Sequence, residues 1–179
     1  VAESAQPVLF DVNTADGRRQ LGLPDGADGL PAGTAVYSFG VRPGIDASCV
    51  NLYQATVPTL LGASDAFIER GGFRFSNARE DNPWERLNEQ LEDTTIGETT
   101  VPTYPVIGDA NTLQYSLKKR VGATIAVPDE DNPQYALKVV GMLDGSVFQG
   151  VLVLSDENLK TADADVVGSR YFLIEAESK

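Results

Sequence analysis

Residues 136–159 read ALKVVGMLDGSVFQGVLVLSDENL, and this stretch decides the fold. Its first part, Ala136 to Leu143, is rich in β-branched and apolar residues and predicts a strand that ends in a turn. Val151 to Leu154 is a continuous apolar run, which is typical of a strand buried on both faces. Ser155 can then cap a short helix that has two acidic residues in its first turn. The stretch therefore predicts two strands followed by a helix.

Similar patterns lie on both sides of this stretch. Short apolar runs predict further strands at Tyr104 to Ile107, Ala123 to Val127 and Arg170 to Ile174. Residues 109–120 predict a helix that ends in Lys118-Lys119-Arg120, and this basic triplet is interpreted as a helix terminus, with an anion site as the alternative. Because each helix has one apolar stripe to bury, the pattern predicts an α+β fold, with a mixed sheet and a few helices on one face.

The first hundred residues are less regular. Pro7 to Val12 and Thr34 to Arg42 predict strands, and residues 49–75 predict short strands or extended loops. Residues 82–91 predict a helix that Asn82 caps, with Trp84 on its buried stripe. We expect one domain over residues 1–179, in two subdomains, of which the less regular one lies at about 43–100.

Composition excludes several classes of protein. The chain of 179 residues carries a formal net charge of -12, and a surface of that sign argues against binding to a nucleic acid backbone. Cys49 is the single cysteine, so an internal disulfide is impossible, and a buried structural thiol is favoured over a nucleophile. No apolar run is long enough to cross a membrane as a helix.

The search for catalytic chemistry is mostly negative. The chain has no histidine, which removes the Ser-His-Asp and Cys-His systems, and it lacks the usual nucleotide-binding glycine motifs. Asp25 to Asp28 and Asp129 to Asn132 do not match the spaced calcium loop, so we interpret them as solvated turns. A hydrolase that uses two carboxylates stays open as an alternative. We expect no enzyme activity, no cofactor and no metal.

Four segments of the second half follow one another in an informative order. They are Tyr104-Pro-Val-Ile-Gly-Asp-Ala-Asn111, Lys119-Arg-Val-Gly-Ala-Thr-Ile125, Leu137-Lys-Val-Val-Gly-Met-Leu143 and Val151-Leu-Val-Leu-Ser155. This order resembles the MacB-like periplasmic core domain of FtsX/MacB-type ABC transporter permeases, in which an "iGxtI" strand, a "yxVvGv" strand and a "vlvs" strand succeed one another. The resemblance covers about residues 100–175. Two earlier stretches, Asp46 to Tyr53 and Phe73 to Phe75, belong to no general motif of that family.

The resemblance implies a non-catalytic, extracytoplasmic or periplasmic domain that is inserted between the first two transmembrane helices of a permease. Its implied partners are those helices, a cytoplasmic ATPase that acts indirectly, and a periplasmic partner or lipid-linked cargo. Phe73, Phe75 and Phe148 are candidate partner contacts if they are exposed, with core packing as the alternative. A secreted or surface-bound binding module is the alternative function.

Overall fold

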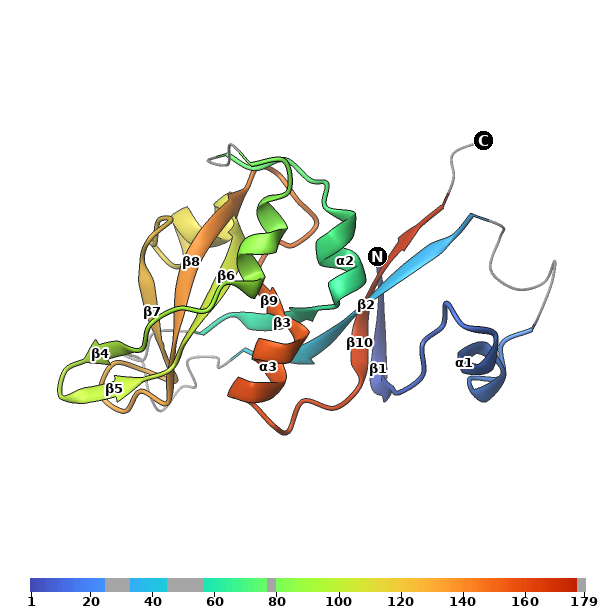
Figure 1. Ribbon diagram of the computed structural model, residues 1–179, viewed down its shortest axis with the longest axis horizontal. Coiled ribbons are helices and arrows are strands. Elements are labelled where there is room, and N and C mark those ends of the chain that lie inside the picture. Colours follow the sequence, from blue (N-terminus) through green and yellow to red (C-terminus); the bar gives the residue numbers. More distant parts are fainter. Residues whose placement is uncertain (25–32, 45–56, 77–79, 177–179) are drawn as a thin grey trace.

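A computed structural model describes residues 1–24, 33–44, 57–76 and 80–176. Its main feature is an eight-stranded mixed sheet in the order β1-β10-β2-β3-β9-β6-β8-β7 (Figure 1). Two neighbouring pairs, β3 with β9 and β6 with β8, are parallel, and the other pairs are antiparallel. The α+β prediction is confirmed.

Most of the predicted strands are present. The sheet contains β1 (Ala2–Val8), β2 (Ala35–Arg42), β3 (Thr59–Ala63), β6 (Thr103–Asp109), β7 (Thr124–Val127), β8 (Tyr135–Leu143), β9 (Val151–Ser155) and β10 (Ser169–Glu175). The first strand was predicted at Pro7 to Val12, but β1 begins at Ala2 and ends at Val8, so the prediction overlaps it only at Pro7 and Val8. Most of this edge strand is the polar segment Ala2 to Gln6, which has no apolar run to signal a strand. The large apolar side chains of Leu9 and Phe10 lie exposed beyond it.

The helices are short and lie mainly between strands. They are α1 (Ala15–Gln20), α2 (Asp65–Arg70), the 3-10 helix η2 (Pro83–Asn88), the π-helix η3 (Thr112–Ser116) and α3 (Asp156–Ala162). Sequence patterns did not predict α2. The helix predicted over 109–120 ends early, because Lys118 adopts a positive φ of 53° that an α-helix cannot contain. An expected linker after residue 91 contains a hairpin of β4 (Thr94–Ile96) and β5 (Thr99–Val101).

Helices cover both faces of the sheet, which corrects the expectation that they lie on one. On one face, α2 and η2 contribute Phe67 and Trp84 to a core cluster with Phe39 of β2. On the other, α3 contributes Leu159 to a second cluster with Leu60 of β3. Both β3 and β9 are buried along nearly their whole length because they face both clusters. The prediction that Val151 to Leu154 is buried on both faces is therefore confirmed for Leu152 to Leu154.

The first and last strands are direct neighbours. Ala2 of β1 pairs with Phe172 of β10 in antiparallel register, so β1 begins on the side of the sheet where β10 ends (Figure 1). The opposite edge of the sheet is β7, which follows η3. The first and last strands of the chain, β1 and β10, therefore lie together at one edge of the sheet. The opposite edge is built by the middle of the chain.

Candidate functional site

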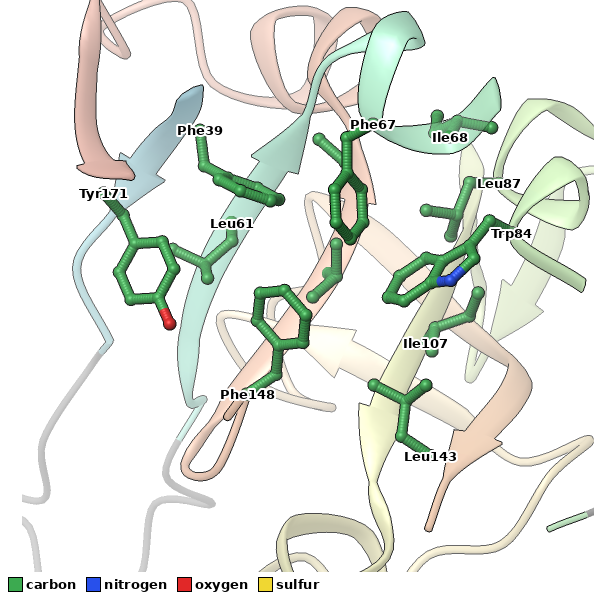
Figure 2. Packing of buried hydrophobic residues seen from close by; sticks show 12 residues of the cluster. Phe39, Leu61, Phe67, Ile68, Trp84, Leu87, Ile107, Leu143, Phe148 and Tyr171 are labelled. Atoms are coloured by element: carbon green, nitrogen blue, oxygen red, sulfur yellow. The ribbon is translucent and has the colours of Figure 1, made fainter. Parts of the chain in front are cut away.

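The three phenylalanines that were predicted as possible partner contacts belong to the core cluster of Phe39, Phe67 and Trp84, which we call the aromatic cluster. Phe148 is fully buried, at 0% exposure, and lies in the centre of the core cluster (Figure 2). Phe73 and Phe75 are half-buried and pack against the same cluster. Ring centroids of Phe73 and Phe148 lie 5.3 Å apart, and those of Phe75 and Trp84 lie 5.4 Å apart. Phe148 therefore presents no ring to a partner, and core packing describes all three residues better.

The sole tryptophan is central to this cluster, as its helical stripe predicted. Trp84 has 0% exposure, and its indole nitrogen donates a 2.9 Å hydrogen bond to the carbonyl oxygen of Gly72. Asn82 caps the helix as expected, since its side-chain oxygen accepts from the Trp84 amide. The Asn82 side-chain amide also donates to the carbonyl of Ile68, which ties η2 to α2. The cluster is thus held by polar bonds as well as by ring packing.

A buried carboxylate fixes the turn that carries Phe148. Asp109, at the end of β6, is fully buried and accepts hydrogen bonds of 2.8 and 2.9 Å from the Ser146 amide and hydroxyl. A third bond comes from the Asn111 amide. The Phe148 amide donates in turn to the Ser146 hydroxyl. Asp109 begins the helix predicted over residues 109–120, and nothing in the sequence indicates its link to Ser146, 37 residues away.

A second buried polar group joins β2 to the end of α3. Arg42 forms an ion pair of 3.3 Å with Asp163. Its second guanidinium nitrogen, Nη1, and the hydroxyl of Tyr135 are buried without a hydrogen-bond partner in the described part of the chain. Burial raises the pKa of Tyr135, and the nearby Arg42 partly opposes that rise.

The acidic residues that the structure describes form no metal cluster. In the described ranges, no group of three or more acidic, histidine or cysteine side chains is placed to hold a metal ion. Asp129 accepts from the amides of Asp131 and Asn132, which is an ordinary Asx turn. The Asp25 to Asp28 segment and Cys49 lie outside the described residues.

Among the grooves lined by described residues, three that are open to solvent bear on function. One of about 480 Å³ lies between α2, η2 and the start of α3, and its carboxylates, all exposed, are those of Asp65, Glu89, Asp93 and Glu157. A carboxylate hydrolase needs one acid in a desolvated pocket, which these exposed groups do not provide. A larger groove of about 790 Å³ lies beside β1 and β10 and is mostly apolar. The third, of about 620 Å³, is lined by the basic triplet.

Among the residues described, no helix is long and apolar enough to cross a lipid bilayer. Comparison of the sequence with protein-family models finds no matching model, and comparison with curated proteins finds no match.

Proposed function

We propose that this chain is the non-catalytic, extracytoplasmic domain of an FtsX/MacB-type ABC transporter permease, which relays conformational change and contacts cargo or partner proteins. The proposal begins from the order of segments between Tyr104 and Ser155. These segments cover most of β6, the start of β7, most of β8, and β9, and all four strands lie side by side in the sheet. A shared order of adjacent strands is more informative than the same short motifs scattered over a surface.

The observation that supports the proposal most is the pairing of the outer strands. A domain inserted between two membrane helices must receive and return the chain on the same side. Ala2 of β1 pairs with Phe172 of β10, and β10 runs on to Glu175, so the outer ends of both strands lie close together (Figure 1). This arrangement meets the geometric requirement of an insertion between two helices.

The packing fits a mechanical element. A relay transmits movement when its packed elements move as a unit about hinges outside the core. Here α2, η2 and the turn at residues 144–150 are all fixed to the sheet through the aromatic cluster (Figure 2). Such a domain needs a stable core and no reactive group, and it would lie outside the cytoplasm, anchored by the helices of the same permease.

A labelling experiment on the full-length protein in intact cells tests the location. In a Cys49→Ser background, Tyr115→Cys places a thiol at a side chain that is 74% exposed. A maleimide that cannot cross membranes should label it without lysis. Val153→Cys is the matched control, since its buried side chain is close to cysteine in size and should react only after denaturation. Labelling of Tyr115→Cys only after lysis would place the domain in the cytoplasm and contradict the proposal.

The parent gene provides the second test. The proposal expects one span of about 20 apolar residues before Val1 and about three such spans after Lys179. A signal peptide with no downstream span would instead favour the secreted or surface-bound binding module.

A further inference from the structure

The basic triplet at residues 118–120 does not terminate a regular helix. Helix η3 ends at Ser116, and Lys118 lies beyond it with a φ of 53°. The Lys119 amide donates a 2.8 Å hydrogen bond to the carbonyl of Leu113, which folds the triplet back over η3. The Gly122 amide then donates to the carbonyl of Val139 in β8. The backbone of the triplet is thus fixed at both ends, and the helix-terminus interpretation accounts for only part of it.

These three cations differ from most others in the chain. Acidic partners are present for Arg19, Arg42, Arg70, Arg74, Arg86 and Lys160. No ion pair within the described ranges involves Lys118, Lys119 or Arg120. In a chain with a net charge of -12, three consecutive cations without a carboxylate partner form a distinct local field.

The cations line a groove with an apolar part. Its remaining lining residues are Gln114, Val121 and Met142. The volume of about 620 Å³ is that of a small-molecule site rather than of an extended protein interface. A ligand that suits this lining has an anionic head and an apolar substituent.

We propose that this groove, which we call the basic groove, binds the phosphate group of an amphiphilic phosphate ester. Arg120 can form a bidentate bond to phosphate oxygens, and the two lysines add ammonium donors. The apolar substituent lies on Val121 and Met142. The groove is at the β7 end of the sheet, away from β1 and β10 (Figure 1), so the inference does not depend on the transport proposal.

The test is a titration of the purified chain with dodecyl phosphate below its micelle concentration, followed through the amide NMR signals of Lys119 and Gly122. Inorganic phosphate and dodecanol are titrated in parallel. We expect dodecyl phosphate to bind most tightly, and the triple variant Lys118→Gln, Lys119→Gln, Arg120→Gln to raise its dissociation constant by more than about tenfold. A control variant that removes the same charge elsewhere, Arg74→Gln, Lys160→Gln, Arg170→Gln, should change it by less than about twofold.

Several results would overturn the proposal. Equal affinity for inorganic phosphate and dodecyl phosphate would mean that the apolar part of the groove, Val121 and Met142, contributes nothing to binding. Equal loss of binding in the triple and control variants would mean that net charge, not the groove, attracts the ligand. Tighter binding of a polyglutamate peptide than of dodecyl phosphate would make the surface a protein-docking site. Five of the six substituted side chains are exposed and Lys119 is half-buried, so circular dichroism is used to verify that each variant remains folded.

Discussion

At the scale of single residues, the backbone conformation of Lys118 is the clearest case of a local cost in folding free energy. A side chain with a β-carbon loses about 1–2 kcal/mol in the left-handed region, where glycine is the common residue at helix ends. Lys118 nevertheless occupies that region, at a φ of 53°, and contributes a cation to the basic groove. At position 118, the proposed phosphate binding therefore favours lysine, whereas folding stability favours glycine.

Lys118→Gly should stabilise the fold. We expect the free energy of unfolding to rise by about 0.5–1 kcal/mol, because relief of the strained φ outweighs the added entropy of the unfolded chain. Urea denaturation followed by Trp84 fluorescence measures it. Lys118→Ala removes the same charge but keeps the β-carbon, so it should give no gain. Equal stabilisation by both variants would mean that charge, and not strain, is responsible.

Asp109 is a second residue whose contribution to the stability of the fold can be measured separately. Asp109→Asn keeps the size of the side chain but turns one acceptor oxygen into a donor that faces the Ser146 amide. We expect a loss of about 1–3 kcal/mol of stability, because a buried donor is left without its acceptor. Asp129→Asn is the matched control. Its exposed Asx turn should tolerate asparagine within about 0.5 kcal/mol.

At the scale of elements, the turn at residues 144–150 connects the Asp109 bonds with the aromatic cluster. Phe148→Ala should cost about 3–5 kcal/mol, as expected for removal of a fully buried ring that several other rings surround. Val147→Ala changes the neighbouring side chain, which is 51% exposed, and should cost less than about 0.5 kcal/mol. Thermal unfolding compares the two. A small cost at Phe148 would reopen its interpretation as a partner contact.

The packing of α3 on the sheet depends on a glycine in β3. A β-carbon at Gly62 would lie 2.9 Å from Leu159 Cδ2 and 3.0 Å from the Cα of Asp156. Because the second contact is backbone, Gly62→Ala should push α3 away and cost about 1–3 kcal/mol. Gly40→Ala meets only side-chain atoms, at 3.1 Å or more, and should cost less. Denaturant midpoints of the two variants test this order, and the reverse order would show that α3 shifts freely.

Sequence patterns predicted these elements unequally, for physical reasons. Strands such as β8 and β9, and the Ser155 cap of α3, were predicted because long apolar runs and a capping residue are local signals. Helix α2 was missed because its six residues are too few to show a helical period. The interpretation of the basic triplet was incomplete because a positive φ at a lysine has no sequence signature. The Asp109 bonds were invisible because their partner is 37 residues away.

At the scale of the whole molecule, one pair of neighbouring strands in the sheet, β6 and β9, is joined along a short length, which we call the β6–β9 junction. Between β6 and β9 only Ile107 with Val153 and Gly108 with Leu152 are paired, whereas β6 and β8 pair along seven positions. This junction separates a half that contains β1, β10, β2, β3 and β9 from a half that contains β6, β8 and β7. The less regular subdomain expected at about 43–100 does not follow this junction, because it includes β3 of the first half and none of β6, β8 and β7. The expected division into two subdomains stays a prediction.

The aromatic cluster argues that the two halves unfold together. It joins Phe39 and Tyr171 of the first half to Ile107 and Leu143 of the second, with Phe148 between them (Figure 2). We therefore expect a single cooperative transition, in which Trp84 fluorescence and far-ultraviolet circular dichroism change at the same denaturant concentration. Phe148→Ala should lower the midpoint while the two probes still coincide. Separate midpoints in the unaltered chain would show independent subdomains, and the relay would then move as two bodies about a hinge at the β6–β9 junction.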